Sequence, residues 1–172
     1  MIIFKDLFSE DELFTDTFKY KLVDDIYYHI EGKFIQQSET GDYDIGANPS
    51  AEEADEGTEA SVTTGIDVAL ANRLIEMSTT KAQYKKDIKV YVKKLLAKVA
   101  ETDSKRADFL KNNLPKVITE WIKEYDNMTA FKGESMSVDG TYVLCKYPEG
   151  DCNIGCKIDV YVLKDGLVEE KV

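Results

Sequence analysis

The chain has 172 residues, with 33 Asp and Glu against 22 Lys and Arg, and a formal net charge of −11. Its 43% hydrophobic content supports a folded core, so we expect a single domain over residues 1–172 and exclude general disorder. No apolar run reaches about 18 residues and no signal peptide is recognisable, so we expect a cytoplasmic protein without a membrane span. The acidity argues against nucleic acid as the main partner, because duplex binding needs many Lys and Arg contacts with phosphate.

The charge is distributed unevenly along the chain. Residues 34–72 carry nine acidic and no basic side chains, whereas residues 73–132 carry 14 basic and eight acidic ones. Residues 38–64 also lack hydrophobic periodicity and contain several Gly and Glu residues, which predicts a long mobile acidic loop. The molecule is therefore expected to offer surfaces of opposite sign, and the acidic loop is one internal candidate for covering the basic segment.

The first 35 residues favour short strands. Apolar or alternating patterns predict strands at residues 2–4, 18–22, 26–30 and 33–35. The acidic segment 9–14 suits a turn or a short helical turn capped by Ser9.

The middle of the chain predicts a helical hairpin over residues 80–126. Thr80-x-x-Gln83 is a capping box, and apolar residues then recur at intervals of three or four. A second amphipathic stretch follows a short turn, and Pro115 is expected to kink or restart this second helix. The face of the first helix opposite its apolar residues carries seven lysines: Lys81, Lys85, Lys86, Lys89, Lys93, Lys94 and Lys98. This lysine face is either an ordinary solvated surface or a binding site for an acidic partner.

The last forty or so residues return to strand patterns. Residues 135–138, 141–147, 158–163 and 167–172 are predicted strands, separated by the turn signals Asp139-Gly140 and Asp165-Gly166. Residues 66–77 look helical by pattern alone. Strands at both ends of a helical hairpin indicate the α+β class.

No constellation of residues supports an enzyme. His29 is the one histidine, and its place in an alternating strand favours a structural role over a catalytic base. No phosphate-binding glycine loop occurs. Without a signal peptide, Cys145, Cys152 and Cys156 are expected to stay reduced, with Cys145 in the core. Cys152 and Cys156 supply only two of the four ligands that a closed zinc site needs, so we expect no tightly bound cofactor.

Residues 42–53 place oxygen ligands at four positions of a calcium-binding loop. Ala47 occupies the position where such a loop needs glycine, and no helices are predicted on either side. This pattern allows weak calcium association and leaves the metal ligands undefined.

Several segments resemble one family, that of translationally controlled tumour protein. The resemblance rests on Met-Ile-Ile-Phe-Lys-Asp at residues 1–6, Asp-Glu-Leu-Phe at 11–14, and Ile-Gly-Ala-Asn-Pro-Ser-Ala-Glu at 45–52. It continues with Phe-Lys-Gly-Glu-Ser-Met-Ser-Val-Asp-Gly at 131–140 and Lys-Asp-Gly-Leu-Val-Glu-Glu-Lys at 164–171. These motifs occur in the family's order and spacing. The resemblance implies a mixed, mainly antiparallel sheet, a projecting helical hairpin, and a strand over residues 62–70.

The resemblance also implies a multi-partner regulatory protein. It suggests calcium binding, microtubule stabilisation, anti-apoptotic partners, and contact with small GTPases or elongation factors through Glu12, Leu74 and Glu134. An alternative is an exchange factor or chaperone for a small GTPase that acts through Glu12. The segment 81–98 matches the region that the family uses for tubulin and calcium. Besides the expected cytoplasmic location, a nuclear pool or export without a signal peptide is left open.

Four positions depart from the family pattern, and one of them is Ala47, which stands where the loop signature usually has a second glycine. Val172 stands where the family often has a cysteine credited with dimerisation, so we expect a monomer. Tyr43 and Ala60 lie near the positions of the family's phosphorylated serines, so that regulation is not expected here.

Overall fold

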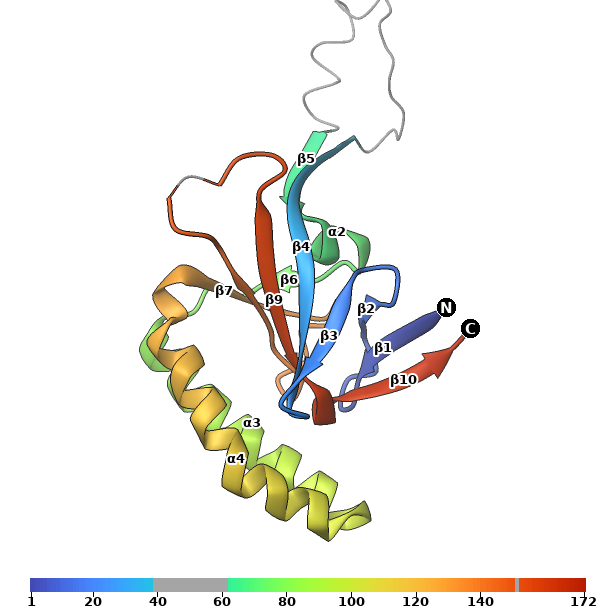
Figure 1. The fold of residues 1–172 in the computed structure, drawn as a ribbon, viewed down its shortest axis with the longest axis vertical. Helices are drawn as coiled ribbons and strands as arrows, with labels where there is room; N and C mark the ends of the chain where they lie inside the picture. Colours follow the sequence, from blue (N-terminus) through green and yellow to red (C-terminus); the bar gives the residue numbers. More distant parts are fainter. Residues whose placement is uncertain (39–61, 151) are drawn as a thin grey trace, which may run out of the picture.

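The computed structural model describes residues 1–38, 62–150 and 152–172. In this part of the chain, ten strands and three α-helices form three layers (Figure 1). The strands are β1 (Ile2–Asp6), β2 (Glu12–Thr15), β3 (Tyr20–Val23), β4 (Tyr27–Ser38), β5 (Val62–Ile66), β6 (Ile75–Glu76), β7 (Met128–Lys132), β8 (Val143–Lys146), β9 (Lys157–Leu163) and β10 (Leu167–Lys171). The helices are α2 (Asp67–Ala71), α3 (Lys81–Thr102) and α4 (Ser104–Lys123), with short 3-10 turns at Tyr125–Asn127 and Lys164–Gly166. The α+β class is confirmed.

The strands form two sheets. The central sheet has seven strands in the order β3-β4-β9-β8-β7-β6, with β5 paired to β4, and the smaller sheet has the order β10-β1-β2. Every strand pairing recorded in the described part of the chain is antiparallel. The turn predicted at Asp165-Gly166 is formed as a 3-10 turn, but the strands on either side do not pair with each other: β9 pairs with β4 and β8, while β10 pairs with β1. This connection therefore joins the two sheets.

Alternating side chains of the central sheet face two different cores. In β8, Leu144 packs with the helical hairpin, whereas Val143 and Cys145 pack toward Phe4 and Phe14 of the small sheet. Successive residues of a strand point to opposite faces, so a strand buried on both faces is apolar throughout. The hairpin and the small sheet thus cover opposite sides of the central sheet (Figure 1).

The predicted hairpin is present as α3 and α4. The Thr80 hydroxyl accepts a hydrogen bond from the backbone N–H of Gln83 at 3.1 Å, which is half of the predicted capping box. The Gln83 side chain instead donates to Asp87 at 2.8 Å. The predicted restart at Pro115 is wrong, since α4 continues through it. Its neighbour Leu114 is buried, so apolar packing holds the helix across the missing hydrogen bond.

The predictions for residues 62–77 are each confirmed only in part. The strand that the family resemblance implied over 62–70 is formed over Val62–Ile66 as β5, and the helix that the pattern predicted over 66–77 is formed only over Asp67–Ala71 as α2. The Asp67 carboxylate accepts hydrogen bonds from the backbone N–H groups of Lys33 at 2.9 Å and Val68 at 2.8 Å. These hydrogen bonds connect the first turn of α2 to β4, and β5 ends where this turn begins.

Three further predictions are corrected by the structure. The turn predicted over residues 9–14 gives way to β2 from Glu12, because this segment pairs with β1. Residues 135–138 form a turn instead of a strand, and the Lys132 ammonium donates to the carbonyls of Ser137 and Val138. The two strands predicted over 26–30 and 33–35 are one long strand, β4.

The cysteines are partly as predicted. Cys145 is buried and free, and burial raises the pKa of its thiol. Cys152 and Cys156, which we expected to be reduced, form a disulfide across Cα atoms 5.5 Å apart. Gly155, with φ of +94°, turns the chain between them. The single histidine, His29, lies in β4, and its Nε2 is 2.8 Å from a carboxylate oxygen of Asp159 on β9.

The predicted acidic loop is largely outside the described residues, and so is the calcium-loop pattern at 42–53. In the described ranges, none of the helices is long and apolar enough to cross a membrane.

Candidate partner-binding surfaces

The structure brings two predicted site residues together on what we call the acidic surface, made of Asp11, Glu12, Arg73 and Glu134. Glu12 begins β2, and Glu134 lies in the turn after β7. Together with Ala71 and Asn72, these four residues line an open cavity of about 310 Å³. Both glutamates are exposed, so their carboxylates are available to a partner.

Asp11 joins the two segments that carry these glutamates. Its Oδ2 accepts hydrogen bonds from the Ser135 hydroxyl at 2.6 Å, the Ser135 backbone N–H at 3.2 Å and the Ser9 hydroxyl at 2.9 Å. Gly133 is required beside it, because a Cβ at that position would overlap the Asp11 side chain. The spacing of Glu12 and Glu134 is therefore fixed by hydrogen bonds between residues 124 positions apart.

Arg73 is a residue of this surface that the sequence patterns did not reveal. Its Nη1 lies 3.7 Å from Glu134 Oε1, and both side chains are largely exposed. The available signal was composition: the chain has only two arginines, the residue type suited to carboxylate recognition. The predicted contact residue Leu74 is only 8% exposed and packs in the core, so the structure does not place its side chain on the acidic surface, and its part in a GTPase contact stays a prediction.

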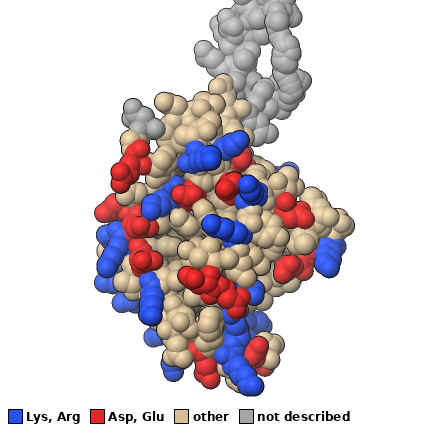
Figure 2. Space-filling view, viewed as in Figure 1, with Lys and Arg blue, Asp and Glu red and all other residues tan. Residues whose placement is uncertain are grey.

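All seven lysines of the predicted lysine face are exposed on α3. Figure 2 shows Lys and Arg side chains along the hairpin, interspersed with carboxylates. Three of the lysines form ion pairs: Lys81 with Asp126 at 3.7 Å, Lys98 with Glu101 at 3.7 Å, and Lys94 with Asp139. Lys85, Lys86, Lys89 and Lys93 have no ion pair recorded within the described ranges. The structure therefore divides the lysine face into paired and unpaired members.

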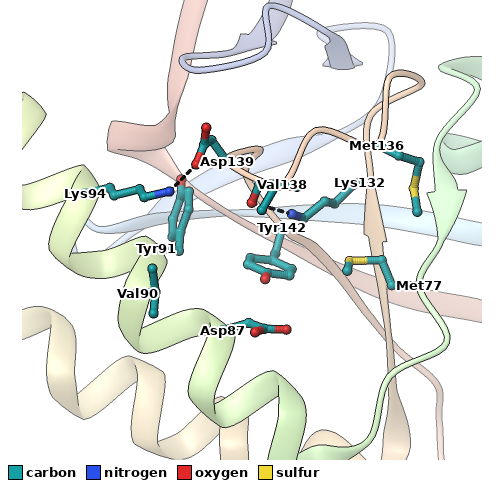
Figure 3. Close-up of a pocket in the computed structure, with 10 residues that line it drawn as sticks. All are labelled: Met77, Asp87, Val90, Tyr91, Lys94, Lys132, Met136, Val138, Asp139 and Tyr142. Atoms are coloured by element: carbon teal, nitrogen blue, oxygen red, sulfur yellow. Dashed lines mark hydrogen bonds and ion pairs between the residues drawn. The ribbon is translucent and has the colours of Figure 1, made fainter.

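Lys94 belongs to a different environment from the other lysines. It lines a cavity of about 260 Å³ between α3 and the turn after β7, where it pairs with Asp139 (Figure 3). The Lys94 ammonium holds the pKa of Asp139 below its usual value. On the same wall, Lys132 is buried over the Tyr142 ring, and burial lowers the pKa of its ammonium. The ammonium groups of Lys94 and Lys132 therefore interact with the turn after β7, and Lys94 connects this turn to α3.

No metal centre is evident in the part of the chain that the structure describes. There, no three His, Cys, Asp or Glu side chains gather as a metal site would require.

The fold defines a class: an α+β protein with a two-sheet core, a packed helical hairpin and charged residues presented from regular elements. The family model described as translationally controlled tumour protein matches residues 1–168, and the chain belongs to this family.

Relatives agree with that assignment over the full length. The chain is 41% identical to the translationally-controlled tumor protein homolog of Plutella xylostella and 43% identical to that of Drosophila pseudoobscura pseudoobscura, with 99% of each chain covered. Among solved structures, a translationally controlled tumor-associated protein from Schizosaccharomyces pombe has a TM-score of 0.79 at 34% identity, covering 100% of both chains. The Caenorhabditis elegans protein has a TM-score of 0.74 at 29% identity, covering 100% of this chain and 99% of its own.

Proposed function

We propose that this protein is a multi-partner regulatory binding protein whose acidic surface contacts a small GTPase or an elongation factor. The observation that carries the proposal is the fixed pair of exposed carboxylates, Glu12 and Glu134, held by Asp11. A GTPase presents magnesium and basic residues around its nucleotide, so correctly spaced carboxylates are suitable partners. Holding them in place beforehand reduces the entropy lost on binding.

The same surface supports an alternative, an exchange factor or chaperone acting through Glu12. An exposed carboxylate that approaches the nucleotide site would compete for the magnesium ion that holds the phosphates. Simple binding and nucleotide exchange can be distinguished by measuring GTPase affinity and nucleotide release for the same variant.

The test is a titration of Glu12→Ala against a panel of purified small GTPases, with affinity and nucleotide release measured together. We expect binding to weaken about tenfold, equivalent to about 1.4 kcal/mol. Glu169→Ala, an exposed glutamate on β10, is the matched control and should bind normally. Unchanged affinity of Glu12→Ala for every GTPase that binds the parent protein would refute the contact. Loss of affinity without a change in nucleotide release would favour simple binding over exchange.

A second candidate function is binding to the acidic surface of tubulin. It is supported by the unpaired lysines of α3, which extend along one exposed helix. Reversal of Lys85, Lys89 and Lys93 to Glu should abolish co-sedimentation with microtubules, and raising the salt concentration should weaken binding of the parent protein. Reversal of Lys105, Lys111 and Lys116 on α4 makes the same charge change elsewhere on the hairpin and should have little effect. Equal loss in both triple variants would show that net charge alone is responsible.

Calcium binding, anti-apoptotic partners and a cytoplasmic location remain predictions from the sequence and its family.

A further inference from the structure

A groove lies between α3 and α4 on the side of the hairpin that carries the lysines. Its volume is about 660 Å³. The apolar part is formed by Val92 of α3 with Ile118 and Ile122 of α4, and Val92 and Ile122 are only partly buried. The hairpin therefore leaves an apolar strip open after its other face has packed on the central sheet.

The borders of the groove are positively charged. Lys85, Lys89 and Lys93 line one side and Lys123 of α4 lines the other, while no carboxylate is among the lining residues. No ion pair of these four lysines is recorded in the described ranges. Among the described residues these four ammonium groups meet no carboxylate, in contrast to Lys94, which pairs with Asp139.

We propose that this groove binds an acidic amphipathic helix of a partner protein. Three lysines at intervals of four residues are about 6 Å apart along the axis of α3, and together span about 12 Å. A partner helix with carboxylates at every fourth residue repeats that spacing and can present an adjacent apolar stripe to the groove. An apolar strip bordered by charge is the arrangement by which grooves receive amphipathic helices. The partner helix becomes the third helix of a small bundle.

This proposal does not rest on the GTPase contact, and it goes beyond the tubulin contact with which it shares lysines. Attraction to an acidic surface needs only charge, whereas the groove also requires the apolar stripe of a folded helix. A substitution at Thr119 can test the need for the apolar groove without altering the charge. This threonine is exposed and lines the groove, so Thr119→Tyr fills the space without changing any charge.

The probe is a synthetic helical peptide of about 18 residues, long enough for several turns, with Glu at every fourth position and Leu on the neighbouring stripe. Binding to the full chain is measured by fluorescence anisotropy. A scrambled peptide of identical composition has the same charge but no apolar stripe. We expect the scrambled peptide to bind at least about tenfold more weakly than the patterned one. Thr119→Tyr should weaken the patterned peptide by a similar factor while leaving microtubule co-sedimentation unchanged.

The lysine reversals complete the test. Reversal of Lys85, Lys89 and Lys93 should abolish peptide binding, and reversal of Lys105, Lys111 and Lys116 should preserve most of it. Equal binding of the patterned and scrambled peptides, or no effect of Thr119→Tyr, would overturn the groove while leaving the tubulin contact standing. Self-association of the free protein that Thr119→Tyr abolishes would assign the groove to a second copy and would also overturn the proposal.

Discussion

The acidic surface and the lysine face both present charged side chains to solvent, but different interactions hold these side chains in position. On the acidic surface, Glu12 and Glu134 come from segments far apart in sequence and are held by hydrogen bonds to Asp11 and Ser135. On α3, one regular helix spaces the lysines, and the helix depends on apolar packing beneath it. The first surface is therefore sensitive to the geometry of two turns, and the second to helix packing and to total charge.

The largest expected effect comes from removing the packing under the hairpin. Leu114 is 1% exposed in the cluster that joins the hairpin to the central sheet. Leu114→Ala should lower the free energy of unfolding by about 3 kcal/mol, through lost burial and the cavity that remains. Urea unfolding measures this change. The exposed neighbour Asn112→Ala should change it by no more than about 0.5 kcal/mol. A loss below about 1 kcal/mol in Leu114→Ala would contradict the dependence of the hairpin on this packing.

A smaller effect on stability, with a clear effect on binding, is expected at Asp11. Asp11→Ala removes the acceptor for Ser135 and should lower the free energy of unfolding by about 1–2 kcal/mol. GTPase affinity should also fall, although Glu12 and Glu134 are both retained. Isothermal titration of Asp11→Ala against the GTPase that responds to Glu12→Ala provides the measurement. Asp16→Ala removes an exposed carboxylate nearby and is the control. Undiminished affinity of Asp11→Ala would show that the spacing of the glutamates is not critical.

An effect that is absent near neutral pH and appears only at alkaline pH is expected at Tyr142, which lies where the turn after β7 meets α3. Burial raises the pKa of Tyr142 to about 12, above the ordinary tyrosine value of 10.0. The unfolded chain therefore loses this proton first, so the stabilisation is complete below pH 10.0 and disappears as the pH rises through about 12. Burial raises the pKa of Tyr161 to about 12 as well, so both tyrosines contribute to alkaline unfolding.

Unfolding free energies of the parent protein and Tyr142→Phe, measured from pH 9 to 12, test this expectation. The variant should match the parent near neutral pH within about 0.5 kcal/mol and should lose stability less steeply above pH 10. Identical slopes would mean that Tyr142 does not contribute.

Local patterns predicted the helical hairpin well and the segments 9–14 and 135–138 poorly. Helical periodicity and the Thr80 cap are contained within a few residues, and both are present in the structure. In contrast, β2 and the turn at 135–138 depend on partners elsewhere in the chain, such as the Asp11–Ser135 hydrogen bonds. No local window contains that information.

The same distinction applies to the candidate sites. The lysines of α3 were visible as one helical face, but the groove needs Lys123 and Ile122 from a second helix and emerges only when the two helices pack. Glu12 and Glu134 followed from the family resemblance, whereas Arg73 becomes part of their surface only in the folded chain. The disulfide at Cys152 was missed because the expected reducing environment outweighed the short spacing of the two cysteines.

We propose that the protein has two independent partner-binding surfaces of opposite charge. The most direct measurement compares GTPase affinity and microtubule co-sedimentation for the parent protein, Glu12→Ala, and the reversal of Lys85, Lys89 and Lys93. We predict that Glu12→Ala loses GTPase binding and keeps microtubule binding, and that the lysine reversal has the opposite pattern. Equal weakening of both partners by either variant would contradict the claim, because it would place both contacts on one shared surface.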